Sequence, residues 1–126
     1  MVKVSHHRSV NRLVALGLCQ PEDIRIAMAD GAALLSPEYA EKIRSAERIL
    51  RAISEPSRIK IILLLSKREM CVCELESALQ MAQPTMSHHL GVLERVGLLQ
   101  RSKKERWVFY KLCHSPVTDL VRSMVS

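Results

Sequence analysis

Two helical segments separated by a tight turn, residues 71–79 and 84–96, constrain the fold of this 126-residue chain more than any other feature. Pro84 directly follows the turn, and a proline at the first helical position favours the start of a helix. Three apolar residues of the second segment recur at spacings of four and three, which is typical of a face packed on a core: Met86, Leu90 and Leu93. A helix, a short turn and a helix of these lengths predict a helix-turn-helix.

A two-stranded hairpin is predicted directly after the helix-turn-helix. Gly97 is the expected C-terminal cap of the second helix, and strands are expected over residues 98–102 and 106–112. The connecting residues include no glycine, so the sequence leaves the turn type open. The predicted fold class is therefore mainly α with a small β-hairpin, a winged helix-turn-helix.

Prolines mark the starts of other helices. Pro21 is expected to begin a helix that ends near Gly31, and Ser36 with Pro37 to begin a longer one that ends near residue 53. The sequence accordingly predicts an N-terminal extension over residues 1–36, made of a basic arm over residues 1–12 and short helices. The remaining residues form the second predicted domain, a winged helix-turn-helix for DNA binding and dimerisation over residues 37–126.

Two further helices are predicted in that domain. Residues 57–66 are apolar on nearly all sides, which indicates burial at the centre of the fold. A last helix is expected over residues 116–125. This helix and the one over residues 37–53 carry apolar stripes larger than a small core needs, so we expect them to pair across the two-fold axis of a homodimer.

Composition limits the classes of function. Apolar residues make up 48% of the chain and aromatic residues 3%, so aliphatic helix packing must supply the core. The net charge of +6 and the isoelectric point near 9.5 favour a polyanionic partner. The chain has neither an apolar run of about 18 residues nor a secretory signal, so we expect a cytoplasmic protein without a membrane partner. Its four cysteines are expected to be reduced thiols.

The DNA-binding prediction rests on polar residues around the second helix of the motif. Short polar side chains at the start of a helix in the major groove reach base edges first. The candidates for reading bases are Gln83, Thr85, Ser87 and His88. Residues 81–113 contain six Lys or Arg and two acids, and the expected hairpin contacts to DNA are Lys103, Lys104 and Arg106. His89 points about 100° away from His88 on a helix and is predicted to face the core.

Cys71 and Cys73 stand at the start of the first helix of the motif. In a regular helix two such residues point about 200° apart, so both can ligate one ion only from an extended or frayed first turn. Binding one ion through both thiolates should therefore distort that turn, against which the second helix packs. The helix N-terminus lowers thiol pKa values, an effect that Glu74 and Glu76 oppose.

Residues 47–112 resemble the ArsR/SmtB family of metal- and metalloid-responsive winged-helix repressors. The resemblance rests on Cys71-Val72-Cys73 followed by Glu74-Leu75-Glu76, combined with the Ser87-His88-His89-Leu90 helix. It implies a homodimeric repressor that binds double-stranded operator DNA and is released when an ion binds the cysteines. Arsenic-responsive members often have a third cysteine at the position that Glu76 occupies here. Cys19, from the N-terminal extension, is favoured as the third ligand over Cys113, and a two-thiol site completed by solvent or an exogenous thiol is the remaining alternative.

The number of sulfur ligands decides which ion fits. Thiolates select thiophilic ions. Arsenite and antimonite need three sulfurs in a pyramid, whereas zinc prefers four ligands in a tetrahedron. The resemblance to arsenic-responsive members makes As(III) or Sb(III) the expected inducer, with Cd, Pb or Zn as alternatives.

A second hypothesis is a thiol redox or reactive-sulfur sensor that uses a disulfide and no metal. A disulfide between neighbouring Cys71 and Cys73 would close a strained ring, so oxidation is expected to link distant cysteines. The sequence contains no phosphate loop and no convincing order of Cys, His and Asp, so we do not expect an enzyme.

Overall fold

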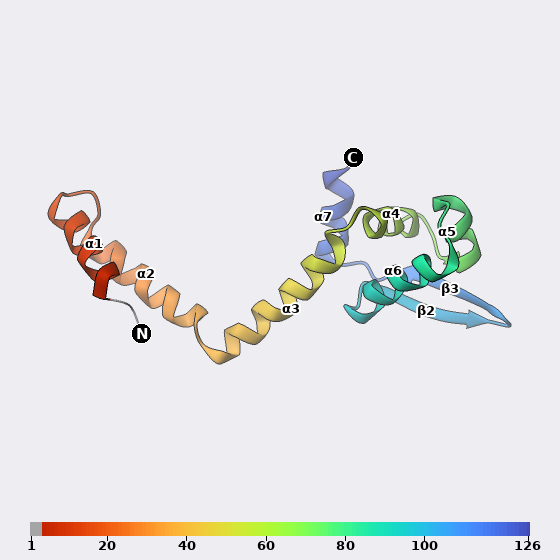
Figure 1. Cartoon of the computed structure of the whole chain (residues 1–126), viewed down its shortest axis with the longest axis horizontal. Helices are drawn as coiled ribbons and strands as arrows, with labels where there is room; N and C mark the ends of the chain where they lie inside the picture. The colour runs from red at the N-terminus through yellow and green to blue at the C-terminus, as the bar shows by residue number, and fades with distance from the viewer. Residues whose placement is uncertain (1–3) are drawn as a thin grey trace. The chain divides into compact units, whose positions relative to one another are not determined.

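The computed structural model describes residues 4–126, with side chains from residue 8 onward (Figure 1). Its elements in chain order are α1 (Val4–Ala15), α2 (Pro21–Leu34), α3 (Pro37–Ile53), α4 (Pro56–Leu65), β1 (Met70–Cys71), α5 (Val72–Leu79), α6 (Gln83–Arg95), β2 (Leu99–Lys104), β3 (Trp107–Leu112) and α7 (Pro116–Met124). The chain divides into two compact units, Met1–Arg44 and Ser45–Ser126. The division falls within α3. None of the helices in the described residues is both long and apolar enough to cross a membrane.

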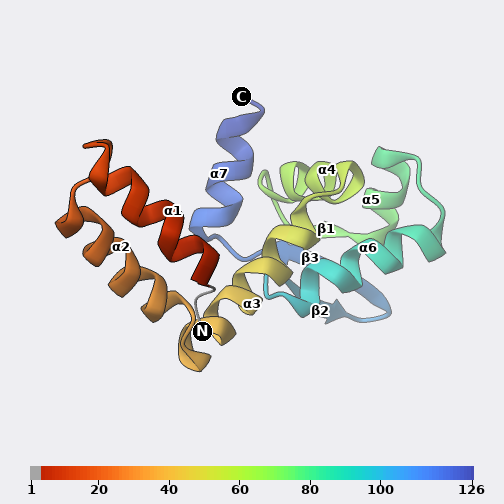
Figure 2. The ribbon, with the colours of Figure 1, turned by 60° about the vertical axis from the view of Figure 1, so that its left-hand side comes forward.

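The first unit contains α1 and α2, which are joined by a short turn (Figure 2). The basic arm expected over residues 1–12 is helical over residues 4–12, and residues 1–3 lie outside the described part. Val10 and Val14 are partly buried, four residues apart on one face of α1. The helix ends at Ala15, and Gly17 in the turn that follows has a φ of +69°, which is readily adopted only by glycine. The second helix runs past Gly31, its predicted end, to Leu34.

The third helix begins as predicted. The hydroxyl of Ser36 accepts a hydrogen bond from the backbone amide of Tyr39 at 3.3 Å, which caps the helix at the residue before Pro37. Its C-terminal part lies in the second unit, where Ala52 is buried and Ile49 packs against the core. The apolar residues that the core does not cover remain exposed, Leu50 among them.

The centre of the second unit is α4, as its apolar sequence predicted. Ile61 and Ile62 are fully buried. The helix packs against α5, α6, α7 and β3, which explains why no side of it can be polar along its length. Glu55 caps its N-terminus by accepting a hydrogen bond from the amide of Arg58.

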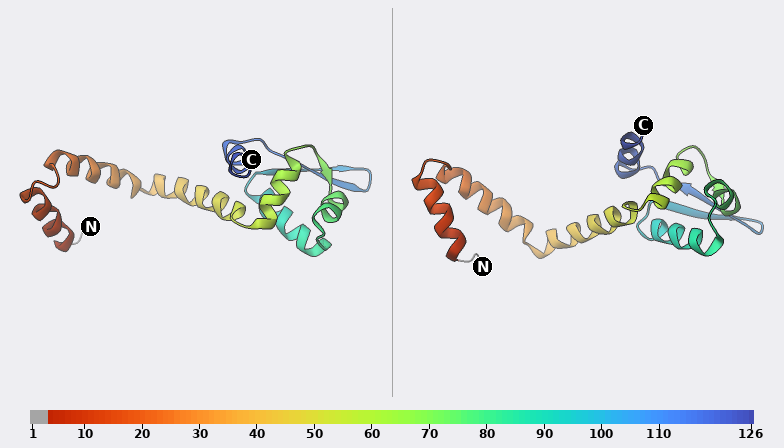
Figure 3. Two further views of the ribbon diagram at one scale, coloured as in Figure 1. Left: turned by 90° about the horizontal axis from the view of Figure 1, so that it is seen from above. Right: turned by 45° about the horizontal axis from the view of Figure 1, so that its top comes forward.

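A three-stranded antiparallel sheet in the order β1, β3, β2 completes the second unit. The predicted hairpin is present, with Leu99 opposite Leu112 and Lys104 opposite Trp107, and it projects past the helices of this unit (Figure 3). Its two-residue loop contains no glycine because Glu105 itself adopts a positive φ of 57°. The sequence did not predict the short strand β1, which pairs with β3 through Cys71 and Phe109.

Candidate functional site

The helix-turn-helix consists of α5, a turn and α6. Gln80 ends α5 in the left-handed conformation, and the amide of Met81 then donates a hydrogen bond to the Glu76 carbonyl. The inward residues of the motif are fully or almost fully buried: Leu75, Met86, Leu90 and Leu93. The spacing that predicted this motif is therefore the spacing of its core contacts.

The four predicted base-reading residues are all exposed on α6 or at its start. They do not share one narrow face, because successive helical residues point about 100° apart. Gln83 and Ser87 lie on the flank toward the hairpin, where they line a groove with Arg106 and Trp107. His88 lies on the opposite flank, toward α3. Thr85 points about 200° from Gln83 around the helix.

His89 is 9% exposed and faces the core of the second unit, as predicted. Its Nδ1 lies 3.1 Å from Nη1 of Arg58 and 3.7 Å from a carboxylate oxygen of Glu55. An arginine can only donate, so Nδ1 accepts and carries no proton. Burial lowers the pKa of His89, and Arg58 adds to that effect, while Glu55 opposes it. The neutral imidazole therefore joins α6, the recognition helix of the helix-turn-helix, to the start of α4.

Protonation of His89 should couple stability to pH. Because the pKa of His89 is lowered in the folded protein, the unfolded chain binds the proton more readily. The free energy of unfolding should therefore be level above the ordinary histidine pKa of about 6.5 and fall as the pH drops below it. We expect urea unfolding between about pH 8 and pH 5.5 to show this fall, and His89→Gln to remove it. The exposed His114 supplies the control, since His114→Gln should keep the fall; equal slopes in wild type and His89→Gln would contradict the assignment.

The predicted hairpin contacts to DNA, Lys103, Lys104 and Arg106, are exposed near the tip. The ammonium group of Lys104 lies 4.7 Å from the centre of the Phe109 ring and 3.4 Å from a carboxylate oxygen of Glu69. The guanidinium group of Arg106 lies 4.9 Å from the centre of the Trp107 ring. Aromatic rings thus hold two of the three predicted hairpin contacts in place.

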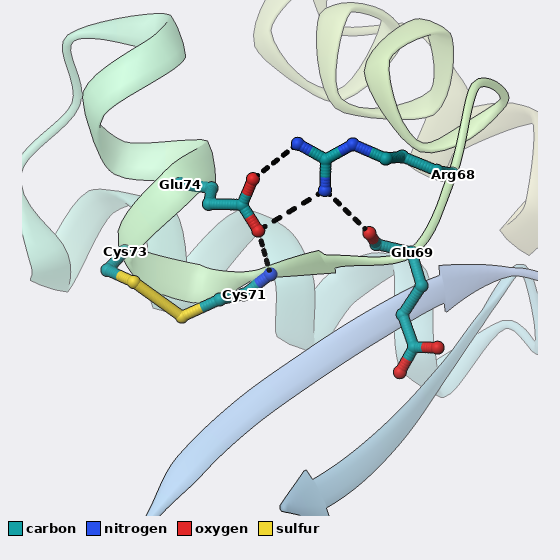
Figure 4. The surroundings of a disulfide bond; sticks show 5 residues. All are labelled: Arg68, Glu69, Cys71, Cys73 and Glu74. Atoms are coloured by element: carbon teal, nitrogen blue, oxygen red, sulfur yellow. Dashed lines mark hydrogen bonds and ion pairs between the residues drawn. A yellow bond between two sulfur atoms is a disulfide. The ribbon is translucent and has the colours of Figure 1, made fainter.

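Cys71 and Cys73 are joined by a disulfide at the junction of β1 and α5 (Figure 4). Oxidation was expected to link distant cysteines, and all four cysteines were expected to be reduced thiols; the structure instead joins these two neighbours and leaves Cys19 and Cys113 free. Cys71 has the extended angles φ −68° and ψ 149°, so it precedes the first turn of α5 and is not 200° from Cys73 around a helix. Their Cα atoms are 5.3 Å apart, within the usual range for a disulfide. Cys71 is 6% exposed, whereas Cys73 is open to solvent.

Glu74 holds the backbone amide of Cys71 in place. Its carboxylate accepts a hydrogen bond from the amide of Cys71 at 3.1 Å and forms an ion pair with Arg68. The hydrogen bond from Arg68 and then that from Cys71 lower the pKa of Glu74. The arrangement is a capping box, in which the third residue of the helix reaches back to the residue that precedes it.

The other two cysteines do not join the pair within the described residues. Cys71 lies opposite Phe109, and Cys113 follows four residues later, about 13 Å farther at the usual rise of a strand. Cys19 belongs to the other unit. Among the residues whose side chains are described, no three His, Cys, Asp or Glu side chains gather as a metal site. The structure thus brings together two of the four candidate sulfur ligands.

A groove of about 560 Å³ connects the cysteine pair with the recognition helix. Both cysteines line it, together with Gln83 and Ser87 at the start of α6 and with Arg106 of the hairpin. A change in the conformation of Cys71 or Cys73 therefore occurs on the same surface as two of the predicted base-reading residues.

Sequence reasoning missed Arg58. It stands in the first turn of α4, and the sequence carried no signal that set it apart from Lys60, an exposed cation two residues later. Its Nε donates a hydrogen bond to the carbonyl of Ala52, and its Nη1 donates to His89. Arg58 thus connects α3, α4 and α6.

Comparison with known proteins is consistent with this geometry. The family model described as bacterial regulatory protein, arsR family, matches residues 55–101. An uncharacterised HTH-type transcriptional regulator of Methanocaldococcus jannaschii is 35% identical over 83 residues, which cover 65% of this chain and 93% of that protein. The arsenic resistance transcriptional regulator ArsR1 of Pseudomonas putida is 36% identical over 88 residues, covering 69% and 68%. The structure of HlyU from Vibrio cholerae superimposes with a TM-score of 0.61 at 31% identity, covering 66% of this chain and 90% of HlyU.

Proposed function

Because the chain belongs to the ArsR family of bacterial regulatory proteins, we propose that it is a transcriptional repressor whose homodimer leaves operator DNA when a thiophilic ion binds Cys71 and Cys73. One observation carries this proposal: the two sulfurs lie at the start of the helix-turn-helix, in the groove that Gln83 and Ser87 also line. An ion held there acts directly beside the DNA-reading helix. The ion-responsive state is the reduced protein, in which both sulfurs are thiols.

The proposed inducer is As(III) or Sb(III), with Cd, Pb or Zn as alternatives. Soft thiolates favour these ions over Mg²⁺ or Ca²⁺. The cysteine pair fits two positions of a three-sulfur site. We favour Cys19 as the third ligand, because Cys113 is about 13 Å away along β3 from the strand residue opposite Cys71. Cys19 can come from the same chain or from the partner protomer.

The proposed release mechanism depends on the cap of α5. Cys71 is the capping residue, and its amide is held by Glu74. The two sulfurs already lie together at the cap of α5, so an ion held between them pushes them apart and places its charge at the start of α5, which packs against α6. Gln83 and Ser87 then leave the position needed to read bases. The free-energy coupling required is modest, typically about 1–3 kcal/mol between effector and DNA sites.

Titration of the reduced wild-type protein tests the proposal. An operator duplex is first selected from random sequence, and its release is then followed by fluorescence anisotropy as arsenite, cadmium or zinc is added. We expect arsenite to release the DNA without any oxidant. Failure of all three ions to release the DNA, with the wild-type protein bound to its operator, would contradict an ion-responsive repressor.

The disulfide between Cys71 and Cys73 supports a second candidate, a thiol redox or reactive-sulfur sensor. In this case hydrogen peroxide takes two electrons and two protons from the two thiols, which form the disulfide while the peroxide becomes two waters. The same anisotropy assay separates the candidates. Peroxide should release the operator and arsenite should not if the redox function is correct.

The proposed homodimer uses apolar side chains that the core of the second unit leaves uncovered. Leu50 on α3 is 57% exposed, Leu120 on α7 is 55% exposed, and Met124 is 74% exposed. Pairing of these helices across a two-fold axis would bury such residues in both protomers. The two recognition helices would then read half-sites about 34 Å apart.

Leu120→Asp should weaken this dimer. Each buried leucine contributes about 1.5–3 kcal/mol and occurs twice in a symmetric interface, so the dimer dissociation constant should rise by about 100-fold or more. Sedimentation equilibrium at micromolar concentration measures the change. Leu35→Asp is the matched control, because Leu35 is exposed in the first unit. A wild-type protein that is monomeric, or a Leu120→Asp variant as dimeric as the wild type, would contradict the interface.

A further inference from the structure

A second cavity, of about 570 Å³, lies on the other flank of the recognition helix. Its walls come from the C-terminal part of α3, the start of α4 and the half of α6 that begins at His88. All of these residues belong to the unit Ser45–Ser126. The cysteine pair does not border this cavity, so the cavity is separate from the groove that Cys71 and Cys73 line.

The ionisable side chains that line this cavity are all basic. Five basic residues border it: Arg48, Arg51, Arg58, His88 and Arg95. None of the described lining residues is acidic. Arg51 is also paired with Glu47, which lies outside the cavity lining. The guanidinium groups of Arg58 and Arg95 contribute a positive potential that is complementary to an anion.

Beneath the basic rim the cavity is apolar. Ile49 and Ala52 of α3 face Val92 of α6 and the neighbouring Val96. Arg58 is held in place by its hydrogen bonds to the Ala52 carbonyl and to His89. A guanidinium group fixed before binding loses little freedom when it pairs with a carboxylate or a phosphate. The volume falls within the range of small-molecule sites, which is about 300–1,000 Å³.

We propose that this cavity binds a small organic anion with a carboxylate or phosphate head and an apolar body, and that the bound anion weakens operator binding. The second half of the proposal depends on the DNA-binding function proposed for this chain. The DNA backbone is a poorer match for the site, because it offers no apolar group to cover Ile49, Ala52 and Val92.

The position of the cavity explains the coupling. His88 belongs to the predicted base-reading set and also lines the cavity. Arg58 contacts His89 on the same helix. An anion that pairs with Arg95 and approaches His88 therefore changes the charge beside the DNA-reading surface, and its negative charge repels the nearby DNA backbone. Coupling must be reciprocal, so operator DNA should weaken anion binding by the same factor.

Phenyl phosphate is a suitable probe, because it combines a dianionic head with an apolar ring. Its binding to the full-length protein is measured by isothermal titration calorimetry without DNA, and phenol serves as the neutral control. We expect saturable binding of phenyl phosphate with one site per protomer, and no binding of phenol. Arg95→Gln should weaken phenyl phosphate binding about tenfold by removing one charge-assisted hydrogen bond. Arg25→Gln, an exposed residue of the first unit, should leave it unchanged.

Any other result of these titrations contradicts the proposal. Absence of phenyl phosphate binding at millimolar concentration rejects the anion site, and equal binding of phenol rejects the role of the charged head. Unchanged affinity in Arg95→Gln places the probe elsewhere. Because this assay contains no DNA, it gives the same answer whether or not the protein is a repressor.

Two further measurements distinguish the other occupants of the cavity. If a DNA phosphate occupies it, Arg95→Gln will flatten the salt dependence of operator binding in the absence of any small anion. If a second copy of the chain covers it, Arg95→Gln will change the dimer dissociation constant. Either result overturns the proposal. The proposal requires that Arg95→Gln leave the salt dependence of operator binding and the dimer dissociation constant as in the wild type. It also requires that saturating phenyl phosphate weaken operator binding by the wild type, and that the same concentration have no such effect on Arg95→Gln.

Discussion

Cys71→Ser and Cys73→Ser should each abolish the release of operator DNA by arsenite while leaving DNA affinity nearly intact. A neutral hydroxyl is a poor ligand for a soft ion, so either substitution removes one of the two sulfurs at the start of α5. The fold should tolerate both changes. Serine is close to cysteine in size and is a favoured residue at the capping position that Cys71 occupies, and Cys73 is exposed. Fluorescence anisotropy gives the arsenite concentration needed for half-release, and circular dichroism checks the fold.

The remaining cysteines provide the controls for this experiment. Cys19→Ser should weaken the arsenite response if the N-terminal extension donates the third sulfur. Cys113→Ser should leave the response unchanged, because Cys113 is displaced along β3 from the position opposite Cys71. A double variant without Cys71 and Cys73 that still releases DNA on arsenite addition would refute the proposed ion site.

Substitutions on the DNA-binding surface should separate into two classes. Ser87→Ala or His88→Ala should weaken binding to the operator by about 1–3 kcal/mol for each base that the side chain reads, with little effect on unrelated DNA. Lys104→Gln or Arg106→Gln should weaken binding to all sequences and reduce the slope of log affinity against log salt by about 0.9 for each phosphate that the cation neutralises. Mobility-shift titrations with the operator and with a scrambled duplex, at several salt concentrations, distinguish the classes.

A matched control for the lysine is Lys60→Gln on α4, which is exposed and lies outside the predicted contact set. It should preserve both the affinity and the salt slope. If Ser87→Ala and His88→Ala weakened operator and scrambled DNA equally, the proposed reading edge would be wrong, even if the hairpin contacts were correct.

The sequence predicted the elements whose pattern is local. The helices from Pro21 and Pro37 begin at prolines because a proline fits the first helical turn, and the spacing of Leu90 and Leu93 marks a buried face. The two-residue strand β1 was beyond such reasoning, since it exists only through pairing with β3. The helix α1 was missed because its basic residues outweighed a short apolar face.

In the site too, the features that depend on local geometry could be predicted, and those that depend on tertiary packing could not. The requirement that Cys71 be extended, if both sulfurs are to meet, came from helix geometry alone, and Cys71 has extended angles in the structure. The burial of His89 also followed from its angle relative to His88. The basic cavity could not be predicted, because Arg58 and Arg95 are distant in sequence and meet only after α3, α4 and α6 have packed. The groove between the cysteines and Arg106 has the same tertiary origin.

The division of α6 into a buried and an exposed side affects how this protein can diverge. The buried side, with Met86, Leu90 and Leu93, carries the stability of the motif, whereas Ser87 and His88 make no contribution to the core cluster. Mutations at the exposed positions can therefore accumulate without unfolding the helix. After gene duplication, copies of such a protein could acquire new DNA targets by drift and selection at a few codons, while the buried scaffold stays the same.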